Sequence, residues 1–284
     1  MTAIQQWFFE TIKTDTHHFN QAFILSSQDS LDTAILEQSL VAIIKHHDLL
    51  RATYPLEEGN LIQTIHPESP LDFQIVNLKE TTQSSAVIER YANETQASFD
   101  LTKGPLVKAI LFKKETQDEL LLVIHHLVVD GVSWRIILED LTTAYQQLAT
   151  AKSVKLPLKT APFTWWSKQI SDYANSEASL QHQAYWSQVL NQSVDQLIID
   201  YPEQPNTVGD SATVSVQLNA KETQSLLKAT NKAYNTEIND VLLCALSRAL
   251  QQTFGGTSYQ ITFCLLYTSP SPRDATLSRM PSSA

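Results

Sequence analysis

Two apolar runs joined by a short polar segment constrain the fold of this chain more than any other feature. The runs cover residues 107–112 and 120–124, and the segment between them reads KKETQDE. Apolar runs of this length are typical of buried strands, and a short polar connection between them is typical of a hairpin. Apolar residues then recur at helical spacing over 133–148. The sequence therefore predicts a buried hairpin followed by an amphipathic helix.

Other periodic stretches extend this pattern along the chain, with Asp29 and Ser30 as candidate caps of the second helix. Helices are expected at 3–12, 31–47, 83–97, 133–148, 163–175, 178–190, 220–232 and 237–252. Strands are expected at 18–25, 50–55, 60–65, 72–77, 213–218 and 259–263. Mixed helices and strands favour an α/β or α+β layered fold, with a lobe boundary near 151–175.

The composition excludes several functional classes. The chain has 284 residues and a formal net charge of −10, which argues against binding to nucleic acid through its phosphates. No apolar stretch reaches the length of a membrane span, and the N-terminus lacks the layout of a signal peptide. Cys244 and Cys264 are too few for a disulfide framework or a zinc site. We expect a cytoplasmic protein that binds neither nucleic acid nor membrane.

The last residues differ in character from the rest of the chain. Residues 264–284 are rich in proline and serine and show neither helical nor strand periodicity. Such a segment is typical of a disordered tail. The words YTSPSPRD and SRMPSSA also resemble translated adapter or vector sequence. We therefore interpret 264–284 as a non-native tail that takes no part in the predicted fold.

A cluster of polar residues follows the second strand of the predicted hairpin. His125 and His126 end the strand, and Asp130 and Gly131 precede the helix. A corner between a strand and a helix suits catalysis, because rigid elements aim the side chains, and histidine exchanges protons near neutral pH. Asp130 could hold the corner through hydrogen bonds or an ion pair, for example with Arg135. Gly131 would relieve a backbone conformation that a Cβ resists.

The same residues allow plainer interpretations. Histidine pairs also occur at 17–18 and 46–47, so a pair in a core strand can be purely structural. Neighbouring strand residues point to opposite faces, and no further Cys/His cluster completes a ligand shell, so we expect no metal. Ser133 lacks the G-x-S-x-G surroundings of a nucleophile and is predicted to cap the helix.

Several separated motifs carry a family resemblance. The segment HHLVVDGVSWRI (125–136) resembles the HHxxxDG motif of the condensation-domain superfamily of nonribosomal peptide synthetases, which is related in fold to chloramphenicol acetyltransferase. The residues GVSWR are similar to the epimerization branch of that superfamily. IQQWF (4–8) resembles the epimerization motif PIQxWF, with Ala3 in place of the proline, and HFNQ (18–21) resembles the stretch that follows. Supporting matches lie at 99–101, 104–106 and 235–240, and the resemblance covers residues 3–263.

The resemblance implies the architecture. It implies an α/β (α+β) two-layer sandwich, in which a chloramphenicol acetyltransferase-like lobe is followed by an incomplete second lobe of the same kind. The N-terminal lobe would cover 1–160, the linker helices and the beginning of the C-terminal lobe 161–263, and the tail 264–284. A tunnel at the junction of the lobes would receive the phosphopantetheine arm of a peptidyl carrier protein.

The resemblance also implies the chemistry. An epimerization domain inverts Cα of a carrier-bound aminoacyl or peptidyl thioester by removing and returning a proton. By match to the motif, His126 lies at the reacting centre, and His125, Asp130 and Gly131 shape the corner. No cofactor is bound directly, because the substrate arrives on the phosphopantetheine of a carrier protein, and neighbouring synthetase modules are further partners. The second acid–base group of the family is a glutamate in an EGHGRE motif, which this sequence does not contain, so we expect the chain as given to be inactive.

Other functions remain open at this point. A condensation domain would use the same His126 to join two carrier-bound acyl units. A non-catalytic docking module would bind carrier proteins without any chemistry. A free-standing acyltransferase would accept a thioester of coenzyme A.

Overall fold

The computed structural model describes residues 1–81, 83–204 and 207–261. These residues form two compact units, of which the first ends at Leu180 and the second begins at Gln181. The division at residue 160 expected from the family resemblance stays a prediction. Within the described ranges, no helix is both long and apolar enough to cross a membrane.

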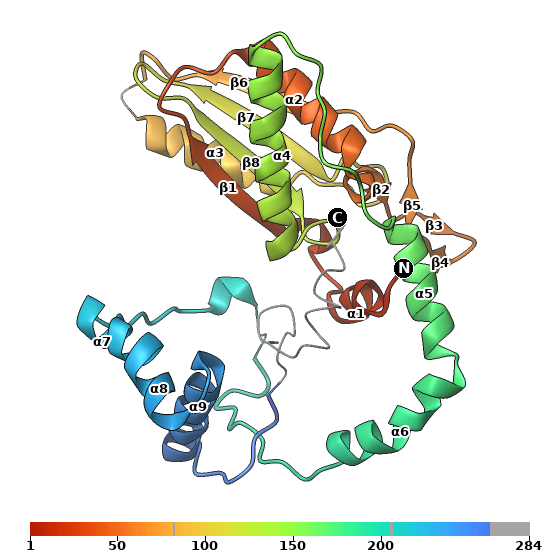
Figure 1. The fold of residues 1–284 in the computed structure, drawn as a ribbon, viewed down its shortest axis with the longest axis vertical. Helices are drawn as coiled ribbons and strands as arrows, with labels where there is room; N and C mark the ends of the chain where they lie inside the picture. The colour runs from red at the N-terminus through yellow and green to blue at the C-terminus, as the bar shows by residue number, and fades with distance from the viewer. Residues whose placement is uncertain (82, 205–206, 262–284) are drawn as a thin grey trace. The chain divides into compact units, whose positions relative to one another are not determined.

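A four-stranded mixed sheet forms the centre of the first unit, in the order β1-β8-β7-β6 (Figure 1). The hairpin predicted from the two apolar runs is confirmed, because β7 and β8 pair antiparallel with Val107 opposite Ile124. On the other side of β8, β1 also pairs antiparallel, whereas β6 runs parallel to β7. The strands are β1 (Asn20–Ser26), β6 (Asp72–Asn77), β7 (Val107–Lys113) and β8 (Glu119–His125).

Helices form at each of the first five predicted positions. Those of the first unit are α1 (Ala3–Thr11), α2 (Thr33–His46), α3 (Ser84–Gln96), α4 (Gly131–Ala149) and α5 (Phe163–Ala174), with the 3-10 turns η1 (Thr16–His18) and η2 (Asp48–Arg51). Short strands form two further pairs, β2 (Ala52–Thr53) with β5 (Thr64–Ile65) and β3 (Leu56–Glu57) with β4 (Asn60–Leu61).

The predicted caps of α2 were wrong. Asp32 is the cap, because its backbone is extended and its Oδ1 accepts a hydrogen bond from the Ile35 N–H at 3.0 Å. Ser30 instead donates its hydroxyl to Asp118 at 3.1 Å, and Asp29 is exposed.

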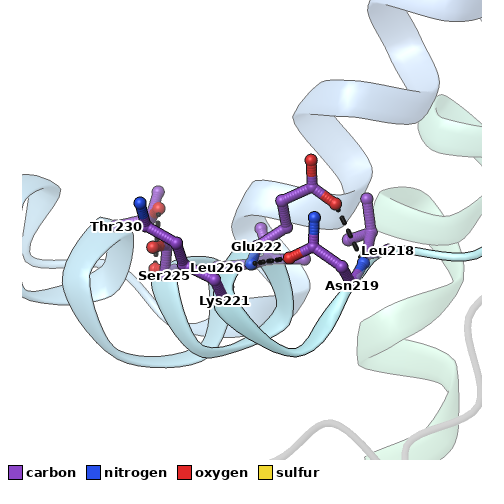
Figure 2. Close-up of a pocket in the computed structure, with 7 residues that line it drawn as sticks. All are labelled: Leu218, Asn219, Lys221, Glu222, Ser225, Leu226 and Thr230. Carbon is purple, nitrogen blue, oxygen red and sulfur yellow. Dashed lines mark hydrogen bonds between the residues drawn. The ribbon is translucent and has the colours of Figure 1, made fainter.

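The second unit is helical in the part of it that the structure describes. Helix α6 (Glu177–Leu190) leads into it, followed by the 3-10 turn η3 (Val208–Asp210), α7 (Ala220–Gln224), the π-helical turn η4 (Ser225–Thr230), α8 (Asn231–Tyr234) and α9 (Ile238–Phe254). A capping box begins α7, in which Asn219 accepts from the Glu222 N–H and the Glu222 carboxylate accepts from the Asn219 N–H (Figure 2). A shallow hollow over this turn is lined by residues 218, 219, 221, 222, 225, 226 and 230.

Two strands were predicted for the second unit. The first was wrong, and the second lies only partly within the described residues. Residues 213–218 are not a strand, and Val214 and Val216 are 91% and 92% exposed. Their alternation fits a strand, but no described segment pairs with them, and a strand needs a neighbour for its backbone hydrogen bonds. Residues 259–261 are also irregular. The rest of that predicted strand and the tail at 264–284 lie outside the described residues.

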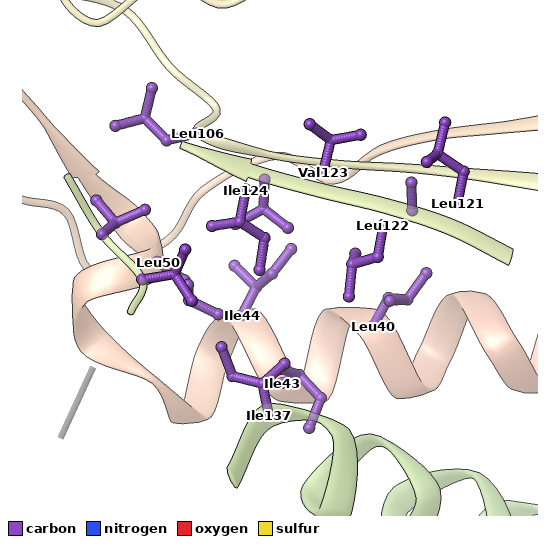
Figure 3. Close-up of a cluster of buried hydrophobic side chains, with 14 of the residues drawn as sticks. Leu40, Ile43, Ile44, Leu50, Leu106, Leu121, Leu122, Val123, Ile124 and Ile137 are labelled. Atoms are coloured by element: carbon purple, nitrogen blue, oxygen red, sulfur yellow. The ribbon is translucent and has the colours of Figure 1, made fainter. Parts of the chain in front are cut away.

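The apolar core of the first unit positions the end of β8. Leu122 and Ile124 point from β8 toward α2, whereas Leu121 and Val123 point to the opposite face (Figure 3). All four residues are at most 2% exposed. The strand is therefore covered on both faces, which agrees with its continuous apolar sequence. Close packing on both faces holds His125, the last residue of β8, in a rigid setting.

Candidate active site

The corner after β8 is held by backbone hydrogen bonds. The N–H of His126 donates to the Phe19 carbonyl at 2.9 Å, which extends the ladder between β1 and β8 by one step. The N–H of Val128 donates to the His125 carbonyl at 3.0 Å, and α4 begins at Gly131. The corner is thus a tight turn between a buried strand and a helix, as the sequence predicts.

His125 is a buried structural residue. It is 0% exposed, and its ring meets the rings of Phe8 and Phe99 edge-on, at centroid distances of 5.9 and 6.2 Å. Nδ1 accepts from the Leu127 N–H at 3.2 Å, so Nε2 carries the proton and donates to the Thr16 carbonyl at 2.8 Å. Burial lowers the pKa of His125 to about 4. The neutral ring has both nitrogens satisfied inside the protein.

His126 lies on the exposed side of the corner. Its ring stacks on Phe19, with 5.3 Å between the centroids and 12° between the planes. Nδ1 lies 2.8 Å from the Val129 carbonyl oxygen, and because a carbonyl only accepts, Nδ1 is the donor. This leaves the lone pair on Nε2, which faces the Gln21 amide nitrogen at 3.2 Å. A neutral imidazole anchored at Nδ1 can take a proton at Nε2.

The two neighbouring histidines therefore have separate surroundings. The alternation of side chains along a strand predicts opposite directions for them, and the structure places His125 in the core and His126 at the surface. They do not converge on one point, so their geometry does not offer a shared metal site.

Asp130 is the cap of α4. Its Oδ1 accepts from the N–H groups of Val132 and Ser133, at 3.1 and 2.7 Å, and from the Ser133 hydroxyl at 2.6 Å. The carboxylate also lies at the positive end of the helix dipole. Among the described residues no cation forms an ion pair with Asp130, and Arg135 is exposed. The hydrogen-bonding alternative for Asp130 is thus the one that the structure shows.

Two further expectations about this corner were wrong. Ser133 is not the cap but the third residue of α4, and its hydroxyl is bound to Asp130. Gly131 is the first helical residue, and it does not have the positive φ that Gly59, Gly104 and Gly255 show. A residue at the first position of a helix needs no special backbone conformation. The structure supplies no conformational reason for a glycine at position 131.

A residue of the opening motif of the chain makes hydrogen bonds to the corner. Gln5 is buried in α1, and its amide donates to the Tyr54 hydroxyl at 3.0 Å and to the Leu127 carbonyl at 3.4 Å. The Tyr54 hydroxyl also donates to the Leu127 carbonyl, at 3.1 Å, and burial raises the pKa of Tyr54. These contacts join α1 to the turn that carries His126. The sequence marked Gln5 as part of a motif but could not show that it reaches Leu127.

A second cluster of ligand-type side chains lies elsewhere in the first unit. His46, His47 and Asp140 bring one ligand atom each within 4.8 Å of one another. His47 Nε2 and an Asp140 carboxylate oxygen are 2.9 Å apart, both side chains are buried, and burial lowers the pKa of His47. This contact connects the residue after α2 to α4, and it gives each of the two groups one hydrogen-bond partner. The sequence pattern shows the histidine pair at 46–47 but does not indicate that Asp140 lies beside it.

Comparison with known proteins identifies the family. The condensation domain family matches residues 1–266. The chain belongs to the condensation domain family. This domain is 43% identical over 264 residues to a linear gramicidin synthase of Brevibacillus parabrevis, covering 90% of the chain and 3% of that protein. It is 42% identical over 256 residues to gramicidin S synthase 1 of Brevibacillus brevis, covering 89% of the chain and 23% of that protein. The domain therefore spans less than a quarter of these relatives.

Solved structures agree with this assignment. The epimerization domain from the third module of tyrocidine synthetase B matches with a TM-score of 0.82 and 38% identity, over 89% of this chain and 57% of that one. The starter condensation domain of the rhizomide synthetase matches with a TM-score of 0.58 and 20% identity, over 66% and 46% of the two chains. The second likeness shows the fold alone. The predicted superfamily and its acetyltransferase-like layered fold are confirmed.

Proposed function

We propose that this domain takes part in epimerization, inverting Cα of an aminoacyl or peptidyl thioester carried on the phosphopantetheine of a peptidyl carrier protein. The observation that carries the proposal is the likeness to the tyrocidine synthetase epimerization domain, at 38% identity against 20% for the starter condensation domain. The residues GVSWR after Asp130 point in the same direction. Like its relatives, the domain would work beside neighbouring synthetase modules.

His126 supports the first half of the reaction. With Nδ1–H bound to Val129, the lone pair on Nε2 takes the Cα proton. The C–H bond breaks, an N–H bond forms, and the electron pair moves into the thioester carbonyl as an enolate. Return of a proton to the opposite face restores the carbonyl with inverted Cα. That step needs an acid on the other side of the substrate, and the family glutamate motif EGHGRE is absent from the 284 residues.

A chimera tests the proposal. Residues 1–254 replace the matching segment of the tyrocidine synthetase epimerization domain, which then supplies its own later residues. An L-aminoacyl carrier protein is added in deuterated water, and both the label at Cα and the D-isomer are measured. We expect epimerization, and a loss of roughly 10² to 10⁴ in rate for His126→Ala. An exposed histidine in α6, His182, provides the matched control His182→Ala.

The same assay separates the alternatives. A condensation domain leaves the single thioester unlabelled and forms a peptide bond once a second aminoacyl carrier is added. A docking module binds the carrier protein with the same affinity in wild type and His126→Ala and shows no chemistry. A folded chimera that behaves in either way contradicts epimerization. The chain by itself, run in parallel, is expected to show exchange at the level of the no-enzyme control.

A further inference from the structure

A line of hydrogen bonds leads from α4 through β1 to His126. The indole N–H of Trp134 donates to Oε1 of Gln21 at 2.7 Å. The amide nitrogen of Gln21 lies 3.2 Å from Nε2 of His126, whose Nδ1 donates to the Val129 carbonyl. Gln21 and His126 are 105 residues apart in sequence.

The direction of each bond follows from the chemistry of its ends. An indole N–H only donates, so it requires the oxygen of the Gln21 amide on its side. The NH₂ of Gln21 then faces His126, and because this group only donates, Nε2 must accept. At the other end the Val129 carbonyl only accepts, so Nδ1 must donate. Both neighbours of the ring therefore select the same neutral tautomer, with the proton on Nδ1 and the lone pair on Nε2.

The first member of this line is held by packing. Trp134 is 3% exposed, and its ring meets Phe23 of β1 edge-on at a centroid distance of 4.7 Å. Gln21 lies on β1 opposite Ile124, next to the pair of Asn20 with His125. The donor that orients the amide is thus buried, and the amide itself is partly exposed beside the exposed His126.

We propose that Gln21, oriented by Trp134, is a positioning residue that holds His126 in the tautomer whose Nε2 accepts a proton. The proposal rests on the proposed function, because it concerns the base of that reaction. The Gln21 amide binds the lone pair on Nε2 of His126 only through a long contact of 3.2 Å at an exposed site. The Cα–H of a substrate therefore displaces the amide from Nε2. Once Nε2 has taken the proton, two donors face each other across this gap. The same arrangement therefore favours release of that proton from His126, which restores the base once the opposite face of Cα has been protonated.

Nuclear magnetic resonance of the nitrogen-15-labelled chain tests the proposal without carrier protein or substrate. A ring nitrogen that bears a proton and one that bears a lone pair have well-separated chemical shifts. The signals of His126 are assigned from their loss in His126→Asn. In the wild type at mildly alkaline pH, where free imidazoles are neutral, we expect a protonated Nδ1 and an unprotonated Nε2. The opposite tautomer, or an equal mixture of the two, would overturn the proposal.

The variant Gln21→Glu replaces the hydrogen-bond donor that faces Nε2 of His126 with an acceptor. A carboxylate still accepts from Trp134 but offers His126 an acceptor and a negative charge, so Nε2 should gain a proton. At a fixed neutral pH, we expect the ratio of His126 with both nitrogens protonated to His126 with one nitrogen protonated to rise about tenfold. Gln146→Glu is the matched control, because Gln146 is exposed on α4 about 18 Å beyond Trp134 along the helix. An equal rise in both variants, or no rise in a folded Gln21→Glu, refutes the positioning role.

The hydrogen bond from Trp134 to Gln21 is tested by a separate measurement. Gln21→Met keeps much of the side-chain volume but removes both amide groups, so the indole N–H of Trp134 loses its acceptor. We expect its proton resonance to move and its exchange with water to quicken, with the signal assigned from Trp134→Phe. An unchanged indole signal would show that Trp134 does not orient Gln21. None of these measurements needs epimerization, so a failed positioning role and a failed function remain distinguishable.

Discussion

Acid should destabilise this fold through His125, the buried neighbour of the proposed base. In the folded chain its Nδ1 accepts from the Leu127 N–H and its Nε2–H donates to the Thr16 carbonyl. A second proton would have to go on Nδ1, where it would face another donor and place a charge in the core. Burial accordingly lowers the pKa of His125 from 6.5 to about 4.

The sign and size of the effect follow from proton linkage. Above pH 6.5 the ring is neutral in both the folded and the unfolded chain, and it adds no pH dependence. As the pH falls from 6.5 toward about 4, His125 binds a proton in the unfolded chain but not in the folded chain. Each pH unit in this interval removes about 1.4 kcal/mol, so the free energy of unfolding falls by roughly 3 kcal/mol in total. That is a large share of the roughly 5 to 15 kcal/mol typical of a domain.

Urea unfolding at a series of pH values measures the effect. The comparison is with His125→Asn, whose side-chain oxygen can still accept from Leu127 but cannot titrate. We expect this variant to be less stable at neutral pH and to lose about 3 kcal/mol less than the wild type between pH 6.5 and 4. His47 shifts in the same direction, and its contribution is common to both proteins. His182→Asn should follow the wild-type curve. Parallel curves for wild type and His125→Asn would refute the reasoning.

Two more predictions concern the contacts that shape the corner, each measured as a loss in thermal and urea stability. Asp130→Ala removes the cap of α4 and should cost about 1 to 2 kcal/mol, whereas Asp29→Ala, at an exposed position that caps no helix, should cost almost nothing. Equal effects would show that the cap contributes little. Gln5→Leu leaves the Leu127 carbonyl with fewer donors and should cost about 1 to 3 kcal/mol, whereas the exposed Gln6→Leu should be nearly neutral. A stable Gln5→Leu protein would show that Tyr54 alone holds the turn.

Local patterns in the sequence predicted the elements that carry the site. The apolar runs of β7 and β8 indicated buried strands, and helical spacing indicated α4, because burial on a given face leaves a periodic trace in a continuous segment. Alternation along β8 also predicted that His125 and His126 point in opposite directions. The same kind of pattern misled at 213–218, where Val214 and Val216 alternate without a described partner strand.

The sequence by itself determined the buried hairpin, the helix after it and the histidine corner between them. Only the tertiary structure decided what each group at that corner does: Asp130 caps a helix, Gln5 reaches Leu127, and Gln21 meets His126. The physical reason is that periodicity reports which side of a segment is buried, whereas a hydrogen bond depends on the partner across the sheet. The register that sets Asn20 opposite His125 brings Gln21 to the proposed base, and that pairing joins residues about a hundred positions apart.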